Sequence, residues 1–430
     1  MNIGYLIRSL RPVRSEHYII LSILIYILPA VLKDFLFLPL VNAISIFAAT
    51  MFIWCLIKYW KGIPIKGWVG LFYILLIIWS VWLTIHMLFI ALPGHTDSAA
   101  NMSLTGKLLK YLTSPYFFPN LLPFMLFCMP KADKFDFNYL WRVMWLLCIL
   151  YLCYAPFVLY NISTYNITAD MLKMDFGEKG SYGDFISNST MGIGNLSPLI
   201  LMIYLKKYLS PRHWKYYILT QIIALFITLY LARRGGTSIM LIYFVLAWGM
   251  YLLNDKKGEE IKKIIFAAIT LVLLYMFFEE TKDSVFSLLM QRGDEDTRSL
   301  IEENFIDDMN THGGWFFGRG WMGEYYAPVI DSYRRMIETG YLGMILKGGF
   351  LYLTLYLLIL GSSVYKGYFR SKNLFCKSFA LIILVQILSM KPSGHPAFNF
   401  PHFAVWLGVW ICNSKYFLTL TDKEVQHKLF

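Results

Sequence analysis

Long apolar runs alternate with short polar segments along the chain, and this pattern predicts an all-α polytopic membrane protein. A spanning helix needs about 20 predominantly apolar residues, so the runs predict about twelve transmembrane helices. Pro119 and Pro123 interrupt one run, which favours a broken or re-entrant segment there. The runs lie near 18–32, 35–57, 68–92, 116–129, 139–160, 190–208, 214–231, 237–253, 262–278, 337–361, 374–390 and 402–419.

The polar segments are short except for one. No linker, repeat or low-complexity tract interrupts the pattern, so we expect a single transmembrane domain over 1–430. The longest polar stretch, 279–335, is expected as a large loop inserted between the ninth and tenth helices. No small-residue cleavage site follows the apolar run at 18–32, which is therefore expected as a first helix rather than a removed signal peptide.

Composition narrows the class of protein further. Of the 430 residues, 57% are hydrophobic and 15% are charged, against about 25% charged in soluble domains. This excludes a soluble globular enzyme and a disordered chain, and continuous apolar runs exclude a β-barrel, whose strands alternate. The six cysteines form no CxxC pair and lie in or beside apolar runs. We therefore predict neither a disulfide framework nor a zinc site.

The net charge of +12 fits a membrane protein better than a nucleic-acid-binding protein. Membrane proteins gather Lys and Arg on their cytoplasmic segments. With the N-terminus placed inside, 24 of the 39 Lys and Arg residues fall on the inner segments. The charge pattern thus predicts both termini in the cytoplasm and 279–335 outside.

Arginine is concentrated on the predicted outer side, where topology does not require it. It makes up 6 of the 24 inner cations but 7 of the 15 outer ones. Guanidinium groups suit bidentate binding of phosphate, so this distribution indicates an anionic ligand outside. The outer arginines are Arg233, Arg234, Arg292, Arg298, Arg319, Arg334 and Arg335.

The first candidate motif is the turn ARRGG at 232–236, which joins two apolar runs with almost no loop. Arg233 and Arg234 fall at the outer membrane boundary, and the two glycines free backbone N–H groups before the next helix. Helix N-termini favour anions, so the motif indicates a diphosphate clamp. The alternative is a pair of arginines that snorkel from an interfacial turn.

The second candidate motif is the loop itself. Arg292 and Arg298 are six residues apart and share no helix face by spacing alone, so the loop would have to fold to bring them together. Arg319 follows in a GRGW motif at 318–321, among glycines and aromatic residues that suggest a packed loop over a sugar site. The alternative is a solvated acidic loop whose ion pairs have no chemical role.

The third candidate motif, RRMIETG at 334–340, opens the helix that follows the loop. Glu338 is expected at or just inside the interface, where an unpaired carboxylate is costly. It either pairs with an arginine or serves as a base. The acidic pair Asp307 and Asp308 has no accompanying ligands, so no catalytic metal is predicted.

Taken in their order along the chain, these helices and motifs resemble the O-antigen ligase/polymerase superfamily. Its members are metal-independent membrane glycosyltransferases of the GT-C type. The resemblance rests on about twelve helices, the ARRGG turn, the large outer loop with spaced arginines and GRGW, and the segment IETGYLGMILKGG. The last two features look most like O-antigen and capsule polymerases of the Wzy type. The specific part of the match covers about 225–350.

The resemblance implies a multi-pass protein of the bacterial inner membrane with its active site on the periplasmic side. Such enzymes join undecaprenyl-pyrophosphate-linked oligosaccharide units into O-antigen or capsular polysaccharide by inverting transfer, without a cofactor. Membrane lipid and a polysaccharide chain-length regulator are the further partners expected. Arginines would hold the diphosphate, and the residues we assign are Arg233, Arg234, Arg292, Arg298, Arg319 and Arg335.

The general base is less clear from the sequence. The ligase branch of the superfamily carries a His-Asn pair shortly before Glu-x-Gly, whereas 330–335 contains no histidine. This departure favours a polymerase over a ligase. The acceptor hydroxyl needs a proton acceptor, and Glu338 and Asp331 are the nearest candidates, with His312 third.

Two other functions stay open at this point. A ligase would transfer the finished glycan to a lipid A core. A flippase or transporter for a lipid-linked sugar would be expected to carry charges near the bilayer midplane and an internal repeat, and the sequence shows neither.

Overall fold

The computed structural model describes a set of helices joined by short loops, together with one small hairpin. Its described residues are 11–32, 38–63, 65–89, 103–113, 118–164, 208, 211–230, 237, 239–246, 299–328, 331–335, 337–391 and 396–429. The predicted helix at 262–278, almost all of the one at 190–208 and the first part of the large loop, 279–298, lie outside them. The chain forms two compact units, 1–142 with 296–430, and 143–295. The single transmembrane domain stays a prediction.

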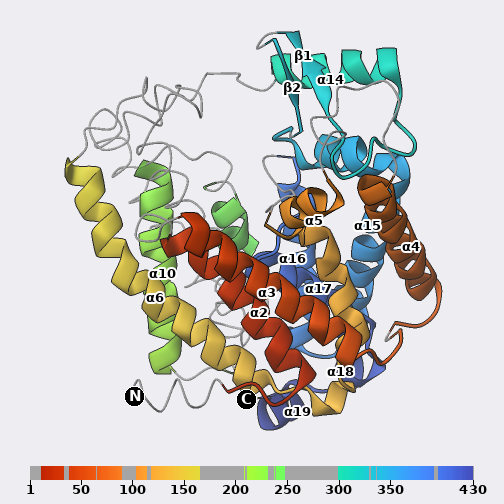
Figure 1. The fold of residues 1–430 in the computed structure, drawn as a ribbon. Coiled ribbons are helices and arrows are strands. Elements are labelled where there is room, and N and C mark those ends of the chain that lie inside the picture. Colours follow the sequence, from red (N-terminus) through yellow and green to blue (C-terminus); the bar gives the residue numbers. More distant parts are fainter. Residues whose placement is uncertain are drawn as a thin grey trace. The chain divides into compact units, whose positions relative to one another are not determined.

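The first unit holds most of the described elements (Figure 1). Before the large loop these are α2 (Ser15–Leu32), α3 (Leu38–Lys58), α4 (Trp68–Phe89), α5 (Leu104–Thr113), the 3₁₀ helices η1 (Phe118–Cys128) and η2 (Ala132–Lys134), and the start of α6 (Phe137–Thr164). From the loop onward they are α14 (Ser299–His312), β1 (Tyr325–Ala327), β2 (Ser332–Arg334), α15 (Gly340–Phe369), α16 (Leu374–Ser389), α17 (Phe400–Asn413), α18 (Lys415–Thr419) and α19 (Asp422–Leu429).

The second unit contains the rest of α6 and α10 (Pro211–Tyr230). Within it, the Trp145 ring of α6 packs edge-on against Tyr216 and Tyr217 of α10, at centroid distances of 5.2 and 6.0 Å.

Among the described helices, four are long and apolar enough to cross a membrane: Pro39–Lys58, Trp68–Phe89, Phe137–Pro156 and Gly340–Phe369. The chain is therefore a helical membrane protein, which confirms the coarse part of the predicted fold. Twelve spans and an external loop remain predictions. One correction is small: β1 and β2 form an antiparallel hairpin within the predicted loop, so the fold is not wholly α-helical.

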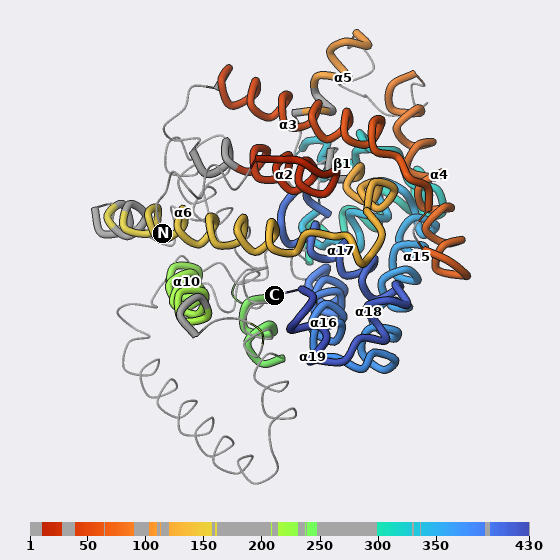
Figure 2. The backbone as a smooth tube through the Cα atoms, turned by 90° about the horizontal axis from the view of Figure 1, so that it is seen from below, coloured from red at the N-terminus to blue at the C-terminus, as the bar shows by residue number. Residues whose placement is uncertain are grey.

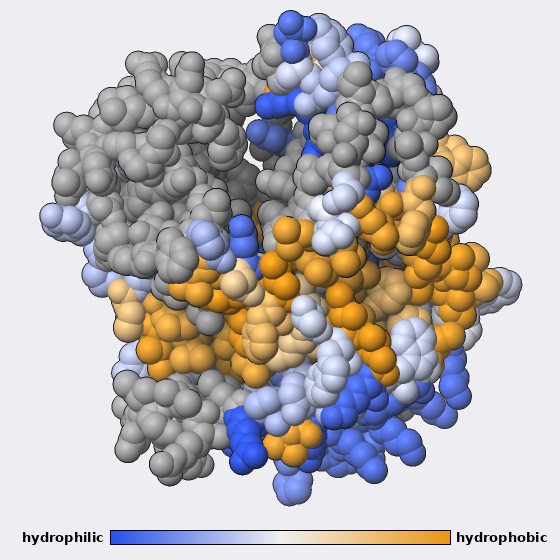
Figure 3. All heavy atoms as spheres, viewed as in Figure 1, coloured by the Kyte–Doolittle hydropathy of each residue, from blue (hydrophilic) through white to orange (hydrophobic). Residues whose placement is uncertain are grey.

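Helix α4 shows how one element divides its faces between protein and lipid. From Trp68 to Phe89, exposed residues such as Ile78 recur every three or four positions, with Val81 and Trp82 adjacent. The opposite face, with Tyr73, is buried. This spacing is that of one helix stripe. In the first unit as drawn in Figure 3, apolar side chains lie between polar residues at either end.

The core of the first unit lies where α15, α16 and α17 pack together, and α4 also packs on α15. Residues 402–412 of α17 are buried on all sides, which explains why they are apolar apart from His402. Gly367 allows close packing there, because a Cβ at this position would lie 2.3 Å from Sγ of Cys412. In Figure 2, α2 lies beside α3, and α16 beside α15.

The proline-interrupted run forms η1, a 3₁₀ helix of 11 residues instead of an α-helix. Such long 3₁₀ runs are uncommon. The hydroxyl of Tyr73 donates a hydrogen bond to the carbonyl of Pro123 at 2.8 Å. The expectation of a broken segment at 116–129 is thus confirmed for its described part.

Segments that the charge pattern placed inside meet at one end of the first unit, which we call the basic end. Arg14 donates to the carbonyl of Lys134 at 2.8 Å, and Asn373 donates to that of Phe417 at 2.8 Å. The ring of Phe137 contacts that of Phe417 and so joins the two sets. We call residues 299–339 the cap. The cap leads directly into the N-terminal end of α15, and Figure 1 shows α14, β1 and β2 at that end, away from the basic end.

This arrangement makes a topological prediction. A cysteine introduced at the exposed position Asn310, in the cap, should react with a membrane-impermeant thiol reagent added to intact spheroplasts, because the positive-inside rule places the basic end in the cytoplasm. The control Gln426→Cys, exposed on α19, should react only after the membrane is opened. The reverse pattern would invert the orientation and the functional argument with it.

Candidate functional site

Helix α15 is broken at Gly349, whose φ of 71° and ψ of −176° are not helical. The break leaves backbone carbonyl groups without helical partners, and such groups are costly inside a membrane. Three of them accept hydrogen bonds from outside the helix: Leu346 from the N–H of Arg319 at 2.8 Å, Lys347 from that of Gly320 at 2.9 Å, and Gly348 from the indole of Trp79 at 3.0 Å.

The N–H groups beyond the break are satisfied in the same way. Phe350 donates to the carbonyl of Trp315 at 2.8 Å, and Leu351 donates to that of Phe316 at 3.2 Å. Residues 313–320, which we call the docking loop, therefore complete the hydrogen bonding of α15. The cap is fixed onto the membrane helix by its backbone.

Two glycines make this close approach possible. A Cβ at Gly318 would lie 2.5 Å from the carbonyl oxygen of Lys347, and one at Gly349 would lie 2.0 Å from that of Phe316. The GRGW and LKGG motifs, which the sequence presents as separate signals, thus interlock.

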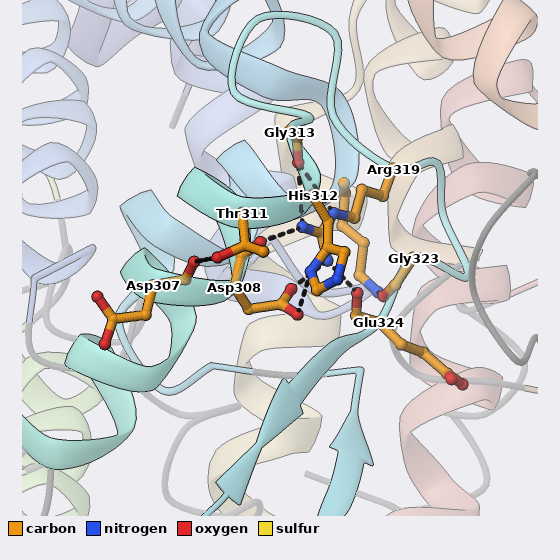
Figure 4. Close-up of polar contacts among 9 residues, drawn as sticks. Asp307, Asp308, Thr311, His312, Gly313, Arg319, Gly323 and Glu324 are labelled. Carbon is orange, nitrogen blue, oxygen red and sulfur yellow. Dashed lines mark hydrogen bonds and ion pairs between the residues drawn. The ribbon is translucent and has the colours of Figure 1, made fainter.

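Arg319 is buried, with 4% of its side chain exposed, and ties α14 to the docking loop (Figure 4). It forms an ion pair with the carboxylate of Asp308. An arginine has five N–H donors, and those of Arg319 make five bonds within the cap. The other acceptors are the carbonyl groups of Glu324 (2.8 Å), Asp308 (3.0 Å) and Gly313 (3.2 Å from Nε, 3.0 Å from Nη2).

This geometry corrects our expectation that Arg319 contacts the substrate. Because its donors are used within the cap, none is left to grip a phosphate. Removing it would leave the buried Asp308 carboxylate without its cation, which is strongly destabilising. Arg319 is therefore best described as a residue that shapes the docking loop.

His312, at the end of α14, lies one helical turn after Asp308. Its Nδ1 is 3.0 Å from Oδ1 of Asp308, while 51% of the His312 side chain is exposed. A carboxylate only accepts hydrogen bonds, so the neutral imidazole donates to Asp308 from Nδ1. The buried Asp308 thus fixes the orientation of a half-exposed histidine on the cap, and the role of His312 as a base stays a prediction.

Arg335 lies in a second charged group of the cap. Its Nε is 2.5 Å from Oε1 of the buried Glu324, and Lys347 of α15 donates to the carbonyl of Gly323 at 2.8 Å. The Arg335 side chain keeps 23% of its surface exposed. Unlike Arg319, it is placed where a ligand at the cap surface could reach it.

The hairpin carries a tyrosine with a perturbed pKa. Burial raises the pKa of Tyr325, and the neighbouring Arg334 opposes this effect. Tyr325 and Arg334 face each other across the two strands. The hydroxyl therefore stays protonated at neutral pH and acts as a hydrogen-bond donor or acceptor.

Asp331 and Glu338 fall at opposite ends of β2. Asp331 closes the hairpin turn with a φ of 45° and accepts a hydrogen bond from the hydroxyl of Tyr326, which raises the pKa of that tyrosine. Aspartate tolerates this left-handed conformation well, which favours a turn role. Glu338 is exposed just before α15, whose N-cap residue Thr339 donates to Glu302 of α14. The structure thus places Asp331 in the hairpin turn and Glu338 just before α15, and the role of each as a proton acceptor stays a prediction.

Four predicted substrate residues, Arg233, Arg234, Arg292 and Arg298, lie outside the described residues. Their role stays a prediction. Within the described ranges, no group of three or more His, Cys, Asp or Glu side chains could hold a metal ion. Metal independence also stays a prediction.

Sequence reasoning missed Asp308 as the partner of His312, although the signal was present. A residue pair at i and i+4 shares a helix face, and 299–312 is a helix. It also missed the break in α15, for which LKGG was the only local sign.

Comparison of the chain with protein-family models, curated proteins and solved structures finds no match. The fold itself defines the class as a helical membrane protein. Its cap carries His312, which Asp308 holds in one orientation. The resemblance to the O-antigen ligase/polymerase superfamily stays a hypothesis carried by the motifs.

Proposed function

We propose that this protein is a membrane glycosyltransferase that polymerises undecaprenyl-pyrophosphate-linked oligosaccharide units at the periplasmic face. One observation carries the proposal: His312, held by the buried Asp308, lies on a cap that is fixed by its backbone to a membrane helix. A catalytic base positioned there suits a substrate that is half lipid and half sugar.

The proposed chemistry balances without a cofactor. The acceptor hydroxyl gives its proton to Nε2 of His312 as its oxygen attacks the anomeric carbon. The bond from that carbon to the diphosphate breaks, and its electron pair leaves with the diphosphate, inverting the configuration. Asp308 stabilises the imidazolium that forms, and guanidinium groups stabilise the charge that develops on the diphosphate.

A glycan ladder from cells lacking the gene tests the proposal. A polymerase predicts loss of chain length, with single units still attached to the acceptor. Loss of all attachment, with lipid-linked polymer accumulating, would identify a ligase instead. Failure of lipid-linked units to reach the periplasmic face would identify a transporter.

The arginines carry their own prediction. We expect alanine variants to shorten the polymer, because loss of a charge-assisted hydrogen bond costs about 1.5–3 kcal/mol, roughly ten- to a hundredfold in rate if it acts in the transition state. Lysine should rescue only in part, since it keeps the charge but loses the planar fork. The variants are Arg233→Ala, Arg234→Ala, Arg292→Ala, Arg298→Ala and Arg335→Ala.

Two controls accompany this series. Arg11→Ala and Arg370→Ala, at the basic end, should leave the ladder nearly unchanged. An unchanged ladder in all five test variants, at normal protein levels, would remove the arginines from the proposal.

A further inference from the structure

The docking loop carries two adjacent phenylalanines that face away from the protein. Phe316 and Phe317 are 57% and 58% exposed, and their rings pack edge to face at a centroid distance of 4.8 Å. Both lie in a cap whose other exposed residues are mostly polar, including His312 and Asp307. Two exposed phenylalanines at one loop tip mark a surface that contacts something apolar.

The depth of these residues follows from the length of α15. Leu351, whose N–H bonds to the carbonyl of Phe316, precedes Lys366 by 15 residues, or about 22 Å of helix. The helix from Leu351 to Arg370 is about 28 Å long. The hydrocarbon core is about 30 Å thick, and any tilt of the helix shortens the depth travelled. With Lys366 or Arg370 taken at the hydrocarbon boundary of the basic end, the loop tip would fall below the boundary on the cap side.

The apolar surface around the tip is continuous with that of α4. The ring of Phe317 contacts Trp79 at a centroid distance of 5.6 Å, and the neighbouring residues Ile78 and Trp82 belong to the exposed stripe of α4. Non-helical backbone is tolerated at this depth only where its polar groups are satisfied by protein. The hydrogen bonds between the docking loop and α15 meet that condition.

We infer that the Phe316–Phe317 tip inserts among the hydrocarbon chains of the cap-side leaflet. The insertion holds His312, four residues before Phe316, close to the level of the lipid headgroups. The depth, the exposed rings and the satisfied backbone support this insertion whether or not the proposed reaction is correct.

Depth-dependent fluorescence quenching tests the insertion in proteoliposomes. Phe317→Cys is labelled with a small fluorophore in a chain whose exposed Cys153 is replaced by serine. We expect strong quenching by phospholipids brominated along their acyl chains and little quenching by aqueous iodide. The matched control is Asp307→Cys, an exposed position on α14 of the same cap. It should show the opposite pattern.

Two outcomes would overturn the inference. Quenching by iodide at both positions would place the loop tip in water. Protection of position 317 from both quenchers would show that protein, such as a second copy of the chain, covers the tip. Because the readout is a depth and not a reaction, its failure is distinguishable from failure of the proposed function.

Discussion

Replacing His312 with alanine is expected to slow chain extension by roughly 10²–10⁴-fold, the usual contribution of a general base. The protein should remain inserted and folded, because His312 is half exposed and its removal leaves Asp308 paired with Arg319. The measurement is the initial rate at which lipid-linked units are extended by membranes containing equal amounts of each variant.

Two further variants sharpen this prediction. His427→Ala, at an exposed position on α19 at the basic end, is the matched control and should retain the full rate. Asp308→Asn should also slow the reaction, because an amide does not stabilise the imidazolium as a carboxylate does. This change also removes the counterion of the buried Arg319, so the rate is compared at equal amounts of folded protein. A normal rate for His312→Ala would exclude the histidine and return attention to Glu338 and Asp331.

Replacing Gly349 with alanine is expected to release the cap from α15. The φ and ψ of Gly349 lie in a region that is essentially restricted to glycine, and the added Cβ would lie 2.0 Å from the carbonyl oxygen of Phe316. Backbone strain alone costs about 1–3 kcal/mol. We expect a lower melting temperature, faster proteolysis within the cap and loss of chain extension.

The same helix offers a matched control. Gly361 of α15 has a negative φ, and a Cβ there would meet nothing within 4 Å. Gly361→Ala should therefore be neutral or stabilise the helix by up to about 1 kcal/mol. Equal melting temperatures and equal cap proteolysis for the two variants would contradict the docking arrangement.

The helices were the part of the fold that sequence reasoning could reach. The apolar run at 374–390 corresponds to α16 within one residue, and that at 68–92 to α4 within three. Local hydrophobicity decides whether such a segment forms a helix in a membrane. Pro119 and Pro123 likewise pointed to the irregular segment that became η1.

The site was harder to predict because its contacts join residues distant in sequence. Arg319 bonds to α15 through its backbone and to Asp308 through its side chain, and composition does not distinguish these partners from a phosphate. Arginine count alone therefore overstated its role in binding. His312 ranked third, after the two carboxylates, because the sequence alone did not show that α14 places Asp308 one turn before it.

Chain extension by the purified protein tests the central claim most directly. The protein is reconstituted in liposomes with undecaprenyl-pyrophosphate-linked units, in buffer containing EDTA. The account predicts longer lipid-linked glycans and release of undecaprenyl diphosphate, with both lost in His312→Ala and retained in His427→Ala. Absence of chain extension by the wild-type protein, or a strict requirement for Mg²⁺ or Mn²⁺, would contradict it.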